Sequence, residues 1–242
     1  MNGLRSLTLT SLIVGSLLLP AIIAPARSTG TTNLLLFDDF THGSPSSQSA
    51  GPTTWDRISL WTTSNVDGTT VWFPSSTVAR FSNLQFSWPP AVSLVSKGQW
   101  TVGSKLVLVE RLRAWSFADQ NGGFAWQTAL DWGAGSAVMG YGRDDAHNPN
   151  TGIMVGGECT ENQPGSVLTT KNLLGQWLTA IIILDGPTQT MYFFVFDSTG
   201  HLLGQTSSTG YCGTMFGTLP AHVLYFTSFG VADIDWIALF HF

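Results

Sequence analysis

An all-β fold is predicted by the composition of the chain and by the spacing of its apolar segments. Charged residues make up only 10% of the 242 positions, while the chain contains 26 glycines, 15 phenylalanines and 10 tryptophans. This composition suits pleated surfaces and is unfavourable in exposed helices. Short apolar or alternating runs are separated by clusters of Gly, Pro, Asn, Asp and Ser. Roughly a dozen strands joined by short turns indicate a sandwich or barrel rather than a parallel sheet.

The strands are predicted from alternating or wholly apolar runs that end at turn residues. Within 231–242, alternation places Ile234, Trp236 and Ala238 on one side, which we expect to face the core. Both sides of 190–197 are apolar, which predicts a central strand. In order, the predicted strands are 34–40, 71–73, 78–81, 92–95, 105–115, 123–132, 136–141, 152–155, 177–185, 190–197, 202–206, 223–229 and 231–242.

The first 26 residues are typical of an export signal. Arg5 precedes an uncharged apolar run, and Ala24-Pro25-Ala26 offers the small-x-small pattern that signal peptidase recognises. A retained membrane anchor is the alternative, but the run is short for a spanning helix. We therefore expect a signal peptide at 1–26, a short tether at 27–33 and one β-sandwich domain at 34–242, in a protein that is secreted or held at the cell surface.

The charge of the chain bears on its partners. The formal net charge is −5. A mildly acidic chain lacks the basic patches on which binding to nucleic acid and to anionic lipid depends. No second segment is long and apolar enough to cross a bilayer, so no membrane insertion is expected after signal cleavage.

Only two cysteines occur in the chain, Cys159 and Cys212. In an exported protein an even pair most simply forms one disulfide. Two free thiols or a metal site are the alternatives, although no further ligands stand at metal-binding spacing around them.

The two ends of the predicted domain resemble the paired terminal strands of the concanavalin A-like lectin/glucanase superfamily. The segments concerned are Phe37-Asp38-Asp39-Phe40 and 231–237, and the run 177–206 is similar to a consecutive hairpin of that group. The resemblance implies a two-sheet antiparallel jelly-roll sandwich that binds or cleaves glycans on a concave sheet. It also implies a structural calcium near the chain ends, for which Asp39 and Asp235 are candidate ligands.

The acidic motif of the glycosidases in that superfamily, Glu-x-Asp-x-(x)-Glu, is absent. Beyond the signal, the glutamates are Glu110, Glu158 and Glu161, and no aspartate has the required spacing from them. Paired carboxylates are what glycoside hydrolysis requires, so Glu110 with Asp131 is the weak catalytic candidate that remains. A Gln–Glu pair of the glutamic peptidase kind, formed by Gln127 and Glu110, has no surrounding motif.

Several aromatic and basic residues are candidates for binding a glycan, because tryptophan rings stack on sugars and arginines donate hydrogen bonds to them. Trp177 and Trp236 lie in apolar strands and are expected in the core instead. The segment 143–148 is dense in polar residues and is predicted to be a solvated loop, a ligand contact or a calcium site. The candidate ligand-binding residues are Trp61, Trp72, Trp88, Arg111, Arg113, Trp115, Trp126, Trp132, Arg143 and Asp144.

Three hypotheses about function follow. The leading one is a secreted, lectin-like module that binds polysaccharide on an aromatic-lined concave sheet. A divergent glycoside hydrolase or polysaccharide lyase is the second, and a structural or adhesive surface protein is the third. The fold alone does not choose among them.

Overall fold

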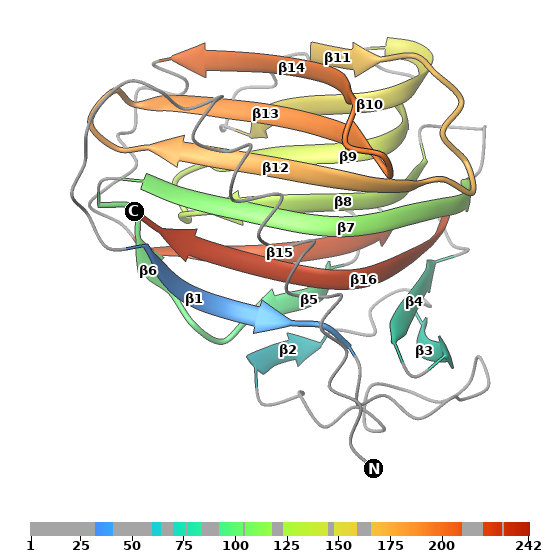
Figure 1. Ribbon diagram of the computed structural model, residues 1–242, viewed down its shortest axis with the longest axis horizontal. Helices are drawn as coiled ribbons and strands as arrows, with labels where there is room; N and C mark the ends of the chain where they lie inside the picture. The colour runs from blue at the N-terminus through green and yellow to red at the C-terminus, as the bar shows by residue number, and fades with distance from the viewer. Residues whose placement is uncertain are drawn as a thin grey trace. The chain divides into compact units, whose positions relative to one another are not determined.

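The computed structural model describes residues 32–40, 60–63, 70–75, 77–83, 92–103, 105–117, 123–144, 148–158, 166–209, 220–228 and 230–242. These residues belong to one compact unit, Thr32–Phe242. They form two antiparallel sheets, one in front of the other in Figure 1. Among them no helix is long and apolar enough to cross a membrane.

Sheet A is the front layer in Figure 1 and has eight strands in the described part of the chain. Its spatial order is β14 (Leu202–Thr209), β13 (Thr190–Asp197), β12 (Trp177–Asp185), β7 (Lys105–Phe117), β16 (Gly230–His241), β4 (Val78–Asn83) and β3 (Thr70–Ser75), and β1 (Asn33–Asp38) also pairs with β16.

Sheet B lies behind sheet A and also has eight strands among the residues described. Its spatial order is β11 (Ser166–Thr169), β10 (Asn148–Glu158), β9 (Ser136–Asp144), β8 (Phe124–Asp131), β15 (Pro220–Ser228), β5 (Val92–Ser96) and β2 (Trp61–Thr63), and β6 (Trp100–Thr101) pairs with β15.

The core fills the space between the two sheets. On β7, Leu106, Leu108 and Leu112 are buried in it, because every second side chain of a strand points to the same face. Sheet B contributes large aromatic rings to the same core, among them Trp126 and Tyr225. Burial of each of these leucines contributes about 1.5–3 kcal/mol to folding.

The strand positions agree closely with those predicted from the sequence. The three strands that were missed, β2, β6 and β11, have between two and four residues each. They are too short to show a period, so an alternating pattern cannot identify them. The segment 143–148, predicted as a loop, instead contributes residues to the ends of β9 and β10.

The last strand is interrupted by a β-bulge that changes which residues face the core. The register with β7 shifts between Ile234 and Trp236. Ile234 faces the core before the shift, and Ile237 and Leu239 face it afterwards. The predicted core position of Trp236 is therefore wrong, because one extra residue moves the following side chains to the opposite face. Trp236 is partly exposed.

A buried hydrogen bond connects the end of β1 to sheet B. Asp38 is fully buried and accepts a hydrogen bond from the Trp61 indole nitrogen at 2.9 Å. Its other oxygen accepts the backbone N–H of Phe40 at 2.9 Å. Because Trp61 lies on β2 and β1 pairs with β16, this contact joins the two sheets at their shared edge.

Candidate functional site

A row of polar and aromatic positions crosses five neighbouring strands of sheet A. In the register, Trp177 of β12 lies opposite Arg113 of β7, and Arg113 lies opposite Asp233 of β16. Asp233 in turn lies opposite Arg80 of β4, which lies opposite Trp72 of β3. The sequence neighbours of these positions on β7 and β12 face the core, so the row lies on the outer face.

Asp233 is the centre of this row. Its side chain is fully buried and accepts hydrogen bonds from three neighbours. Arg80 donates through Nε at 2.5 Å and Nη2 at 2.9 Å, Arg113 donates through Nη2 at 2.7 Å, and the Trp115 indole nitrogen donates at 2.7 Å. Two guanidinium groups and an indole N–H therefore replace the water that this carboxylate has lost.

The arginines and tryptophans of this face stack on one another. The Arg80 guanidinium lies over the Trp115 ring at 5.0 Å, and Arg113 lies over the same ring at 4.3 Å. Arg113 also lies over the Trp177 ring at 4.3 Å, and Arg111 lies over that ring at 5.1 Å. We call the five residues Arg80, Trp115, Arg113, Trp177 and Arg111 the Arg–Trp ladder.

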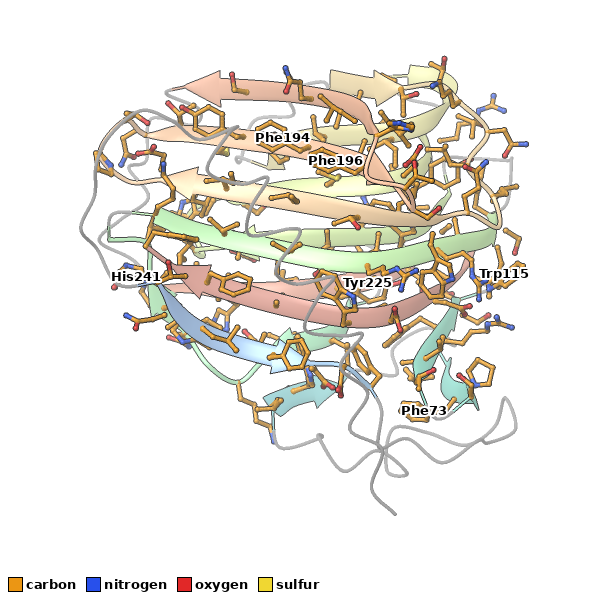
Figure 2. All side chains as sticks on the ribbon, in the orientation of Figure 1. Phe73, Trp115, Phe194, Phe196, Tyr225 and His241 are labelled. Atoms are coloured by element: carbon orange, nitrogen blue, oxygen red, sulfur yellow. The ribbon has the colours of Figure 1, made fainter. Side chains whose placement is uncertain are left out.

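Parts of the ladder are open to solvent. Trp115 is 41% exposed, and the side chain of Arg111 is 38% exposed. Figure 2 shows Trp115 at the end of the sandwich where β4 lies, beside nitrogen-bearing side chains, with His241 at the opposite end. The buried Asp233 carboxylate holds the ladder on the side that faces the sheet. The opposite side of the ladder is exposed to solvent at Trp115 and Arg111.

The residues proposed to hold calcium, Asp39 and Asp235, lie near each other, as the pairing of β1 with β16 requires. Asp235 accepts a hydrogen bond from Arg111 Nη1 at 2.6 Å. The pKa of Asp235 is raised, because the effect of burial outweighs the lowering by Arg111. The nearby Asp39 carboxylate also raises it. A guanidinium already neutralises this carboxylate, and the described residues contain no group of three His, Cys, Asp or Glu able to hold a metal. The calcium predicted at Asp39 and Asp235 therefore stays a prediction.

The ladder contains three of the predicted ligand-binding residues: Arg111, Arg113 and Trp115 lie on the same face of β7. Trp177 was expected in the core, and that prediction is wrong, because its neighbour Leu178 occupies the core side of β12. Arg80 was missed entirely. Its strand alternates between partly exposed and buried positions from Val78 to Phe81, and this alternation predicts that Arg80 points outward.

Three other tryptophans proposed as ligand platforms do not present a ring to solvent. Trp61, Trp126 and Trp132 are at most 3% exposed and belong to the core. Their strands are short or end in turns, which made them look peripheral in the sequence, but each side chain points between the sheets. Of Trp72 only the strand position is described, and Trp88 lies outside the described residues.

The weak catalytic pair is not formed. Glu110 points between the sheets, where it accepts a hydrogen bond from the Thr128 hydroxyl of β8 at 2.7 Å. Asp131 instead accepts the backbone N–H of Gly133 at 2.6 Å in the β8–β9 turn. Gln127 neighbours Thr128 on the outward side of β8, so it does not pair with Glu110 either.

Glu110 has a protonated carboxyl group at neutral pH. Its complete burial raises the pKa from 4.5 to about 8, and the Thr128 hydrogen bond lowers it only in part. Its second oxygen has no hydrogen-bond partner among the described residues, and neither does the Tyr225 hydroxyl. Burial, Glu110 and Asp233 together raise the pKa of Tyr225. A carboxyl enclosed between the sheets cannot reach a polysaccharide on either outer face.

The remaining predicted site residues are only partly described. Arg143 is partly exposed at the end of β9, and its backbone N–H donates to the Gly123 carbonyl at 2.8 Å. Asp144 pairs with Asn148 in the strand register, with no description of its side chain. Cys159 and Cys212 lie outside the described residues, so the predicted disulfide is not tested.

Comparison with known proteins gives the fold. No protein-family model and no curated protein sequence matches the chain. Lectin II from Ulex europaeus superposes with a TM-score of 0.54 at 8% identity, covering 87% of this chain and 100% of the lectin. Lectin I from the same species, bound to the methyl glycoside of α-L-fucose, gives 0.55 at 8% identity, covering 85% and 97%. The fold is the concanavalin A-like jelly roll.

A concanavalin A-like jelly roll was expected from the terminal segments, and two antiparallel sheets with β1 paired to β16 confirm that expectation. A further solved structure of the same fold is titled as lectin UEA-II complexed with galactose, at 9% identity and a TM-score of 0.54. At this identity the similarity concerns the fold, and the function must be argued from the ladder.

Proposed function

We propose that this protein is an exported, lectin-like module that binds glycans through the Arg–Trp ladder on the outer face of sheet A. The observation that carries the proposal is a preorganised cluster of arginine and tryptophan side chains, anchored on the buried Asp233 and open to solvent at Trp115 and Arg111. Glycan binding by solved structures of the same fold is consistent with it.

The chemistry of the ladder suits a sugar ligand. Sugars present hydroxyl groups in fixed directions and apolar C–H faces between them. Guanidinium groups supply several N–H donors in a rigid plane, and an indole supplies a flat apolar surface with a polar edge. Because Asp233 and the stacked rings restrain these groups, little side-chain freedom is lost when a ligand binds.

Export is part of the proposal and rests on the segment 1–26, in which Arg5 precedes an uncharged apolar run and Ala24-Pro25-Ala26 gives the cleavage pattern. Sequencing the N-terminus of protein recovered from the medium tests it. A first residue of Arg27 is expected, whereas recovery only from membranes with residue 1 retained would contradict export as proposed.

Binding is tested by retaining the protein on a panel of immobilised polysaccharides, with elution by the matching soluble oligosaccharide. We expect Trp115→Ala to lose most of the retention, since it removes a ladder ring and one hydrogen bond to Asp233. Leu202→Ala is the matched control, because Leu202 is also exposed on sheet A, at 46%, but lies on the edge strand β14.

The outcomes separate the hypotheses. Equal retention of both variants would remove the ladder from the binding surface. No retention of the unmodified protein on any polysaccharide would contradict glycan binding and favour the structural or adhesive role. Far-ultraviolet circular dichroism and urea unfolding of each variant show whether the fold survives the substitution.

A further inference from the structure

We propose that the ladder selects polysaccharides that carry carboxylate or sulfate groups over neutral ones. This inference rests on the proposed function and names the class of glycan. Its evidence is the layering of charge at the site, the number of N–H donors without a protein partner and the stacking that already covers the rings.

The central carboxylate of the site lies beneath basic groups. The Asp233 side chain is 0% exposed, whereas the side chains of Arg80, Arg111 and Arg113 are 23%, 38% and 21% exposed. Asp235 is 22% exposed and is paired with Arg111. A ligand approaching the sheet over Asp233 therefore meets guanidinium groups first. Three of the ten lysines and arginines of an acidic chain meet here.

Most N–H donors of two arginines have no protein partner. A guanidinium carries five N–H donors. Arg111 donates one side-chain hydrogen bond, to Asp235, and Arg113 donates one, to Asp233. No other side-chain hydrogen bond is made by either residue within the described chain, and Arg113 Nε is buried without a partner. Carboxylate and sulfate oxygens accept such bonds, and the charge makes each bond about twice as strong as a neutral one.

The guanidinium groups of the ladder limit how much of each tryptophan ring a sugar can stack on. Arg80 and Arg113 lie over the Trp115 ring, and Arg111 and Arg113 lie over the Trp177 ring. Guanidinium groups thus cover part of the aromatic surface that a neutral sugar would use. Beside the exposed part of Trp115, a ligand meets the N–H donors along the outer edge of the ladder, and these donors favour anionic groups.

The donors are also spaced for a polymer. Arg111 and Arg113 lie on the same side of β7, two residues apart, which places their Cα atoms about 6.6 Å from each other. One anionic group bound at Arg111 leaves a second donor group within reach of the next charged sugar. Successive contacts of this kind raise the affinity for a chain well above that for a single sugar.

Affinity electrophoresis in native gels tests the proposal with ligands matched in backbone. One gel contains polygalacturonate, the second its methyl ester, which masks the carboxylates, the third chondroitin sulfate and the fourth neutral dextran. We expect polygalacturonate or chondroitin sulfate to retard the protein at least tenfold more strongly than the ester and dextran. Polygalacturonate carries carboxylates only, whereas chondroitin sulfate carries carboxylates and sulfates. Retardation by polygalacturonate therefore shows that a carboxylate suffices, retardation by chondroitin sulfate alone indicates that sulfate is required, and either result supports the proposal.

Variants of β7 give the protein side of the test. Arg111→Gln should weaken retardation by the acidic polymer about tenfold, whereas Lys105→Gln should leave it unchanged. Lys105 is a suitable control because it lies on the same strand and also pairs with an aspartate, Asp185, at 3.1 Å. Equal loss in both variants would indicate a non-specific charge effect and overturn the proposal.

The failure of this inference is distinct from the failure of the proposed function. Equal retardation by polygalacturonate, its ester and dextran would overturn selection for anionic groups and leave glycan binding in place. Retardation in none of the gels, together with no retention on the polysaccharide panel, would overturn both.

Discussion

Asp233 and Glu110 are both fully buried on neighbouring strands of sheet A, but they face opposite sides of the sheet. Asp233 has two guanidinium groups and an indole N–H around it. Glu110 has one hydroxyl from Thr128 and is protonated at neutral pH. The comparison teaches that donors, rather than burial alone, decide whether a buried carboxyl group organises a charged site or remains a neutral part of the core.

The largest effect is expected from Asp233→Asn. This change leaves the guanidinium groups of Arg80 and Arg113 without the buried negative charge that they contact. It should lower the free energy of unfolding by about 3–5 kcal/mol. Urea unfolding at pH 7 measures it. A loss below about 1 kcal/mol, typical of an exposed ion pair, would show that Asp233 does not anchor the ladder.

Glu110→Gln should have the opposite effect at alkaline pH. The folded-state pKa of Glu110, about 8, is above its ordinary value of 4.5. Below pH 4.5 the group is protonated in both states, and the variant and the original protein should be similarly stable. Between pH 4.5 and 8 folding opposes ionisation, so the variant should become more stable by up to about 4 kcal/mol. Urea unfolding at pH 4 and pH 8 measures the difference, and a constant difference would contradict a neutral Glu110.

A smaller loss is expected from Thr128→Val, which keeps the shape of the side chain and removes the hydroxyl. The variant should lose about 1–2 kcal/mol, because the Glu110 carboxyl then has no described hydrogen-bond donor. The Thr128 bond lowers the pKa of Glu110, so its removal should raise that pKa further. Titration of the Glu110 carboxyl by carbon-13 NMR measures this shift, and a lowered pKa would contradict the assigned contact.

The smallest effect on stability is expected from Asp235→Asn. Asp235 and Arg111 are both partly exposed, so their ion pair contributes at most about 1 kcal/mol. The same change removes the negative charge that neutralises Arg111, and retardation by polygalacturonate should increase. Thermal unfolding and affinity electrophoresis of one sample measure the two effects together. Weaker retardation would indicate that Asp235 holds Arg111 in its binding position.

Local patterns predicted most strands because apolar runs and turn residues mark them directly in the sequence. The outward position of Arg111, Arg113 and Trp115 follows from their alternation with Leu112 and Ala114, which face the core. Such alternation depends only on backbone geometry, so it can be recognised without knowledge of the partner strands.

Positions that depend on pairing between distant strands were not predicted. Trp177 belongs to the ladder only because β12 pairs with β7, and Asp233 anchors it only because β16 lies between β7 and β4. The bulge before Trp236 leaves no mark in the sequence either, since Asp235 could equally be an ordinary strand residue. Glu110 was proposed as a catalytic acid because a charge in an apolar strand does not reveal whether that side faces solvent or the core.

The position of β16 in sheet A has a consequence for the order of folding. β16 pairs with β7 along most of its length, with β4 beside its first half and with β1 beside its second half. Asn33 thus meets His241, its partner almost at the other end of the chain. All the strands from β1 to β15 precede β16, so the pairing of sheet A cannot be completed until β16 has been synthesised. Contacts of such high sequence separation make folding slow, on the order of milliseconds to seconds. Until β16 pairs, the edges of β7, β4 and β1 that it covers lack their partner strand.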